Sequence, residues 1–122
     1  MTNDQKFKVL VVEDEVLVRL DLVSQLTEHG YDVVEAGTAI EAMAILERDR
    51  EIRVVFTDIR MPGGMDGVAL ARCVRERWPP TIIVICSGNA DEAVELADIQ
   101  LLHKPYLAEH LTYVLEAVSS QL

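Results

Sequence analysis

Five short apolar runs are the feature that most limits how this chain of 122 residues can fold. They are rich in Val and Ile, and they lie at 9–12, 33–34, 54–56, 82–86 and 99–102. Most of them are continuous rather than alternating with polar residues. Continuous β-branched runs are typical of strands that are covered on both faces, as in a parallel sheet. The sequence therefore predicts a five-stranded sheet between two layers of helices.

The segment 16–29, between the first two runs, has helical spacing. We expect one apolar stripe of this helix to face the core, formed by Val16, Leu20 and Val23. Gly30 then ends the helix, because glycine readily takes the positive φ of a C-terminal cap. Thr38 and Glu41 predict a capping box at the start of the next helix, in which each side chain bonds the other residue's free backbone N–H.

Three more helices complete the alternation, at 67–77, at 90–96 and over the apolar positions between 107 and 118. Strands and helices thus alternate five times, which predicts an α/β, doubly wound (βα)5 fold with a parallel sheet. We expect one domain over residues 1–122, with a flexible N-terminus at 1–7. In such folds the loops at the carboxyl ends of the strands form the functional site.

The charged residues, the length of the apolar runs and the cysteines limit the classes of function open to this chain. The chain has 21 Asp and Glu against 11 Lys and Arg, a net charge of −10. This charge argues against direct binding to nucleic acid or to an anionic membrane, and favours cations and basic protein patches. No apolar run approaches the ~20 residues of a membrane span. Cys73 and Cys86 have apolar neighbours and read as buried, reduced thiols, so we expect a cytoplasmic protein.

Acidic side chains follow two strands of the predicted sheet. Glu13 and Asp14 come directly after the first run, and Asp58 follows the third. If these strands are neighbours, three carboxylates meet at one edge, which is costly unless a cation joins them. Oxygen ligands without His or thiolate favour Mg²⁺. For Glu13 and Asp14 alone, a solvated acidic turn is an equally good interpretation, and Asp58 is what favours a metal site.

Two further groups suit a phosphoryl ligand. Ser87 follows the fourth run and Lys104 the fifth, so both belong to the same edge. A Lys ammonium pairs with a phosphoryl oxygen, and a Ser hydroxyl donates to the same group. Asp58, between these groups and the metal, is then the natural nucleophile and forms an aspartyl phosphate.

Four stretches carry a resemblance that extends over the whole chain: VLVVEDE at 9–15, VVFTDIRMPGGMDG at 54–67, IIVICSGN at 82–89 and LLHKPY at 101–106. Together they resemble the receiver domain of two-component response regulators, the CheY-like family. The resemblance implies a flavodoxin-like sheet with strand order 2-1-3-4-5. It also implies a phosphorylation-dependent switch that signals through protein contacts, or that relays or stores phosphoryl groups. The resemblance further implies a phosphoacceptor that takes part in its own phosphoryl transfer, not a turnover enzyme.

The resemblance also implies which residues act. Asp58 accepts a phosphoryl group from a His of a sensor histidine kinase or phosphotransfer protein. Mg²⁺ is bound by Glu13, Asp14, Asp58 and the backbone carbonyl of Arg60.

The remaining implied roles belong to the fourth and fifth strand ends. Ser87 and Lys104 contact the phosphoryl group. Gly88 leaves access to it, and the peptide bond before Pro105 is expected to be cis, which aims Lys104 into the site.

The sequence departs from the family pattern at three places. Leu101 stands where most receivers have the Tyr or Phe that reports phosphorylation. The segment from Ser87 to Lys104 is several residues short, and Gly63 and Gly64 lengthen the loop after Asp58. The Ser-Gly pair and the missing aromatic resemble an alphaproteobacterial receiver subgroup that is linked to unorthodox sensor kinases.

Other function classes fit less well. A pseudo-receiver that binds partners without phosphoryl chemistry would not need the acidic, Ser and Lys set. A small-molecule phosphatase with an aspartyl intermediate needs a carboxylate where this chain has Arg60. A flavin or nucleotide binder needs a Gly-rich loop after the first strand. The downstream target stays open, as does the choice between a stand-alone receiver and one separated from its output domain.

Overall fold

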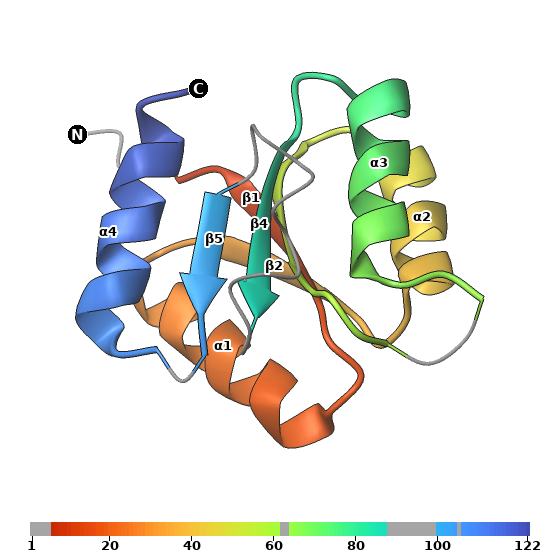
Figure 1. Cartoon of the computed structure of the whole chain (residues 1–122). Helices are drawn as coiled ribbons and strands as arrows, with labels where there is room; N and C mark the ends of the chain where they lie inside the picture. Colours follow the sequence, from red (N-terminus) through yellow and green to blue (C-terminus); the bar gives the residue numbers. More distant parts are fainter. Residues whose placement is uncertain (1–5, 62–63, 88–99, 105) are drawn as a thin grey trace.

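A parallel five-stranded sheet organises the computed structural model of this chain (Figure 1). The structure describes residues 6–61, 64–87, 100–104 and 106–122, apart from the side chains of Ser87 and His103. Within them the elements are β1 (Lys8–Val12), α1 (Val16–Glu28), β2 (Asp32–Ala36), α2 (Ala39–Arg48), β3 (Ile52–Asp58), α3 (Gly67–Arg77), β4 (Ile82–Ser87), β5 (Gln100–His103) and α4 (Ala108–Ser119).

The strand order is β2-β1-β3-β4-β5, so the predicted doubly wound, flavodoxin-like arrangement is confirmed. Every strand pair in it is parallel. The helix predicted at 90–96 lies outside the described residues. None of the described helices is long and apolar enough to cross a membrane.

Both faces of the sheet are covered, as the continuous apolar runs predicted. Helices α2 and α3 pack on one face, and α1 and α4 pack on the other (Figure 1). Successive residues of one strand alternate between these layers: Leu10 faces the α2/α3 side, whereas Val9 and Val11 face the α1/α4 side. All three are fully buried. Burying such a side chain contributes roughly 1.5–3 kcal/mol, so the central strands hold the two layers together.

The strands extend beyond their apolar runs. β3 includes Thr57 and Asp58 after the run that ends at Phe56, and β5 continues one residue past the end of its run, to His103. The extra positions are polar residues that still pair with neighbouring strands, such as Asp58 with Cys86. A carboxylate therefore occupies the last position of a central strand, not the loop after it.

Helix ends follow the predicted signals with one correction. Gly30 has φ +93° after α1, and the Thr38 hydroxyl accepts the Glu41 N–H at 3.1 Å, both as predicted. The prediction of the reciprocal bond in this capping box is wrong in its donor. The Glu41 carboxylate accepts the N–H of Gly37 at 2.7 Å instead of that of Thr38, because the N–H one residue earlier is within its reach.

The predicted core stripe of α1 is wrong at two of its three residues. Val16 and Leu20 are 54% and 48% exposed, whereas Leu22 and Leu26 are buried, with Val23 packed at their side. Apolar residues surround the first half of this helix, so spacing alone does not single out the face that meets the sheet. The structure leaves apolar side chains of the first turn on the surface, beside the carboxyl ends of the strands.

The two cysteines are free thiols, with Cys86 buried and Cys73 half-buried.

At the N-terminal end, the Phe7 ring lies 4.7 Å from the Tyr31 ring, centroid to centroid. The predicted flexibility of the N-terminus stays a prediction, because residues 1–5 lie outside the described ones.

We predict that Gly67→Ala destabilises the protein by at least about 2 kcal/mol, because overpacking forces the backbone to move. A Cβ at Gly67 would lie 1.8 Å from the Asp58 carbonyl oxygen and 2.9 Å from Cα of Ile59. Urea unfolding measures the change. Gly64→Ala is the matched control, since its Cβ would meet nothing within 4 Å, and an equal loss in both variants would contradict the prediction.

Candidate metal and phosphoryl site

Three carboxylates meet where β1 and β3 end. Val12 lies opposite Thr57 in the ladder between these strands, so the residues that follow, Glu13, Asp14 and Asp58, share one edge. One oxygen from each of the three lies within 4.8 Å of the others. The sequence prediction that these side chains gather is therefore correct. It depended on β1 and β3 being neighbours, which the strand order supplies.

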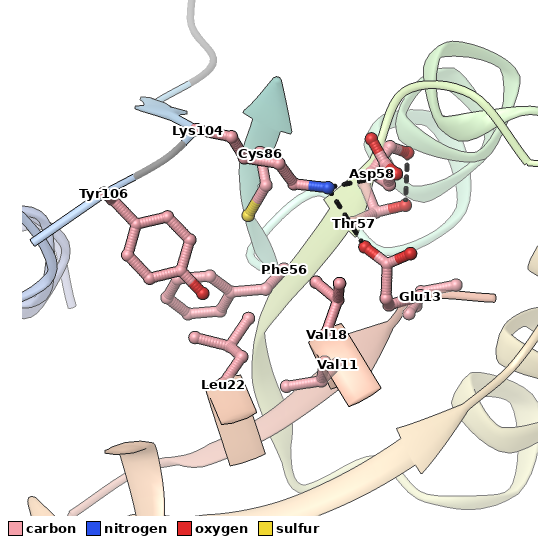
Figure 2. Close-up of a pocket in the computed structure, with 11 residues that line it drawn as sticks. Val11, Glu13, Val18, Leu22, Phe56, Thr57, Asp58, Cys86, Lys104 and Tyr106 are labelled. Carbon is pink, nitrogen blue, oxygen red and sulfur yellow. Dashed lines mark hydrogen bonds and ion pairs between the residues drawn. The ribbon is translucent and has the colours of Figure 1, made fainter. Parts of the chain in front are cut away.

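Lys104 brings a positive charge to this cluster from the other side. Its Nζ lies 3.1 Å from Glu13 Oε1 and 3.1 Å from Asp58 Oδ2 (Figure 2). The residue directly follows β5, two strands away from β3 in the sheet. One ammonium thus bridges the carboxylates of two different strand ends.

Burial makes this charge balance matter. Glu13 is 5% exposed, and burial raises the pKa of its carboxyl although the Glu15 N–H and Lys104 both favour the ionised form. Burial also disfavours the Lys104 ammonium, but its bonds to Asp58 and Glu13 outweigh burial and raise the pKa of Lys104. The lysine therefore keeps its charge throughout the neutral range, and the carboxylates have a counter-ion there.

The backbone around Asp58 is held by local bonds. The Ile59 N–H donates to Asp58 Oδ1 at 2.8 Å, and the buried Thr57 hydroxyl donates to the Asp58 carbonyl at 2.9 Å. The Gly67 N–H donates to the Ile59 carbonyl at 2.7 Å, which brings the start of α3 against the end of β3. The bond at Oδ1 and the ion pair at Oδ2 orient the Asp58 carboxylate.

An apolar wall lies behind the charged groups. Figure 2 shows the Tyr106 ring beside Phe56 and Leu22, below the aliphatic part of Lys104 and near Cys86. Burial raises the pKa of the Cys86 thiol to about 12 and also raises the pKa of Tyr106. Both groups are therefore neutral at physiological pH and add no charge beside the cluster.

The structure describes some, but not all, of the other residues to which the resemblance assigned a role. Arg60 is exposed in the loop directly after β3, two residues after Asp58. Ser87 is the last residue of β4, paired with the end of β5, which brings its backbone to the same edge of the sheet. The Ser87 side chain, Gly88 and Pro105 lie outside the described part of the chain, so the cis peptide bond stays a prediction.

Sequence reasoning missed two residues that touch this site. Tyr106 lines the pocket, and Arg19 donates from Nη1 to the backbone carbonyl of Glu13 at 2.8 Å. Leu101, at the position of the missing aromatic, packs on the α2/α3 side of the sheet, whereas Tyr106 packs on the α1/α4 side. A signal for Arg19 was present, since residues 9–47 contain nine Asp and Glu but a single Lys or Arg.

The donor set fits Mg²⁺. The gathered groups are carboxylate oxygens, two of them on partly open side chains at the surface end of the strands. Mg²⁺ takes one or two protein carboxylates and keeps several waters, which an edge site of this kind allows.

Comparisons with known proteins agree with this geometry. Residues 9–116 match the response regulator receiver domain family. This chain belongs to that family. The probable chemotaxis protein CheY of Rhizobium etli is 32% identical over 100% of this chain and 99% of its own length. The hydrogenase transcriptional regulatory protein HoxA of Cupriavidus necator is 33% identical over 98% of this chain, which spans 26% of HoxA.

A solved structure extends the likeness to three dimensions. The receiver domain superposes on the response regulator TrrA of Thermotoga maritima, crystallised in complex with Mg²⁺-BeF, with a TM-score of 0.83 and 26% identity. The match covers 96% of this chain and 100% of that one. The predicted membership of the two-component receiver family is therefore confirmed. The subgroup without the strand-five aromatic stays a prediction.

We predict that Lys104→Met lowers the free energy of unfolding of the metal-free receiver domain by about 1–3 kcal/mol. Breaking a buried ion pair costs about 3–5 kcal/mol, and the partial exposure of Lys104 and Asp58 reduces that cost. Urea unfolding with a chelator present measures it. Adding Glu13→Gln should recover much of the loss, because no buried charge is then left without its partner. A double variant no more stable than Lys104→Met would contradict this account.

Proposed function

We propose that Asp58 is the phosphoacceptor of this receiver domain, and that Glu13, Asp14, Asp58 and the Arg60 backbone carbonyl bind Mg²⁺. The observation that supports this most directly is the Lys104 ammonium 3.1 Å from an Asp58 carboxylate that lies within 4.8 Å of two others. Such an arrangement holds one nucleophilic oxygen beside a fixed positive charge and a set of oxygen ligands.

The proposed reaction moves a phosphoryl group between two side chains. A carboxylate oxygen of Asp58 attacks the phosphorus of a phosphohistidine on the partner protein. The new O–P bond forms as the N–P bond breaks, and the histidine nitrogen leaves with its electron pair and takes up a proton. When bound, Mg²⁺ neutralises charge on the transferred phosphoryl oxygens. Attack by water on the aspartyl phosphate restores Asp58 and ends the signal.

Lys104 and Ser87 would hold the phosphoryl group once it is on Asp58. The Lys104 ammonium already faces the carboxylate that becomes the acyl phosphate, so it needs only to shift from oxygens of Asp58 to those of the phosphoryl group. Its raised pKa keeps it charged for this role. The Ser87 hydroxyl would donate from the end of β4, where the chain comes to the same edge.

The partner that carries the phosphohistidine must approach this edge, and α1 offers an apolar surface beside it. Leu17 is 82% exposed and lines a shallow groove with Val18, Asp21, Lys104 and Tyr106. Exposed apolar side chains next to a reaction centre are typical of a protein-binding surface. We propose that the sensor kinase or phosphotransfer protein contacts α1 here. A cytoplasmic location belongs to the same proposal.

The acceptor is tested by intact mass after incubation with a small phosphodonor and Mg²⁺. We expect one added phosphoryl group on the wild-type chain, none without Mg²⁺, and none on Asp58→Asn. Asp66→Asn is the matched control, because Asn can still cap α3 through the bond that Asp66 makes to the Ala69 N–H. An adduct on Asp58→Asn would refute the assignment. No adduct on the wild type from this donor or from a phosphohistidine protein would favour a partner-binding pseudo-receiver.

The docking surface is tested by comparing two donors. We expect Leu17→Asp to slow phosphorylation by a phosphohistidine protein at least about tenfold, which corresponds to about 1.4 kcal/mol of lost contact. Its rate with a small phosphodonor should stay unchanged, because that donor needs no docking. Ile40→Asp is the control, since Ile40 is 64% exposed but lies on α2, across the sheet. Equal slowing with both donors would contradict a docking role.

A further inference from the structure

The Arg19 side chain connects α1 to the acidic edge of the sheet, through bonds to Glu13 and Glu35. It is the single Lys or Arg among residues 9–47, which contain nine Asp and Glu. It lies in the second turn of α1, and its side chain is 19% exposed. A guanidinium with so little access to water needs protein partners, and those partners indicate what it holds in place.

The guanidinium makes two bonds in two directions. Its Nη1 donates to the backbone carbonyl of Glu13 at 2.8 Å, and its Nε pairs with the Glu35 carboxylate at 3.0 Å. Glu35 belongs to β2, the strand beside β1. Gly37 lies beside this arrangement, where a Cβ would be in van der Waals contact with Nη1 at 3.4 Å. Arg19 therefore spans from α1 to β2 and holds the Glu13 carbonyl between them.

The Glu13 carbonyl is part of the peptide unit that leads to Asp14. That unit is planar, so the direction of the carbonyl determines where the Asp14 backbone begins. On the other side of Glu13, its N–H donates to the Ala36 carbonyl at 3.0 Å, and its carboxylate accepts the Glu15 N–H at 3.1 Å. The bond from Arg19 therefore holds the peptide unit before Asp14, and the bond from the Glu15 N–H holds the peptide unit after it.

We propose that Arg19 is a positioning residue for divalent-cation binding, which it promotes by holding the peptide between Glu13 and Asp14. This inference rests on the proposed function, because it requires that these carboxylates bind Mg²⁺. Groups that orient metal ligands without touching the metal typically change metal affinity about 10- to 100-fold.

The charge of Arg19, taken alone, predicts the opposite change in Mg²⁺ affinity. Arg19 is a positive charge near the position of a cation, so its removal should strengthen Mg²⁺ binding if charge were its only influence. Positioning predicts weaker binding. The direction of the change in Mg²⁺ affinity therefore separates the two roles, and a purely structural role would change stability without changing affinity.

The experiment titrates Mg²⁺ into the full chain without a phosphodonor and follows backbone amide NMR shifts, with urea unfolding measured beside it. Arg19→Met removes the guanidinium but keeps an apolar stem. Arg19→Lys keeps the charge but has a single nitrogen, which cannot take the places of both Nε and Nη1. Arg77→Met is the control, because it removes an Arg that also pairs with a Glu, at 2.9 Å from Glu47 and away from the site.

We expect Arg19→Met to bind Mg²⁺ about tenfold more weakly than the wild type, Arg19→Lys to lie between them, and Arg77→Met to match the wild type. Unchanged or tighter binding by both Arg19 variants would overturn the inference while leaving the metal site intact. If Arg19→Met does not fold, Arg19→Lys and Glu35→Gln decide, and wild-type affinity in both would overturn it. If the wild-type chain itself binds no Mg²⁺, the proposed metal site fails instead.

Discussion

The ion pairs of Lys104 with Glu13 and Asp58 are the interaction on which the site depends. A carboxylate as buried as that of Glu13 is costly unless a positive charge compensates it, and the ammonium at 3.1 Å supplies that charge. The same ammonium pairs with Asp58. Lys104, which follows β5, therefore balances the negative charges at the ends of both β1 and β3. Under the proposed function, entry of a cation or a phosphoryl group would change this charge balance.

The sheet makes this contact possible. Parallel strands that are covered on both faces leave their polar ends as the place where charged side chains can meet. β1 and β3 are neighbours because the chain crosses over after β2, so residues 13 and 58 come together although 45 positions separate them. The contact between Gly67 and the Asp58 backbone then fixes the start of α3 against the end of β3. Arg19 plays the corresponding part at the end of β1.

Much of the fold could be predicted because its signals are local. Continuous apolar runs predicted the strands, and Gly30 and Thr38 marked helix ends as the structure has them. The buried face of α1 could not be predicted, because apolar residues surround its first half and the sheet alone decides which of them it covers. The carboxylates of the site were found from their places after strands. Tyr106 was missed as a pocket residue, because only packing against Phe56 and Leu22 brings its ring there.

The sequence by itself determined the order of strands and helices, the residue types at the strand ends and the resemblance to receiver domains. These depend on periodicity and on neighbours along the chain, which any reader of the sequence can see. Only the tertiary structure decided that Lys104 bridges Glu13 and Asp58, that Arg19 holds the Glu13 carbonyl, and that Leu17 stays on the surface. Lys104 is 91 positions from Glu13 in the chain, and the other two features depend on how α1 lies beside the ends of β1 and β2. Such contacts depend on how the helices lie across the sheet, which no local pattern encodes.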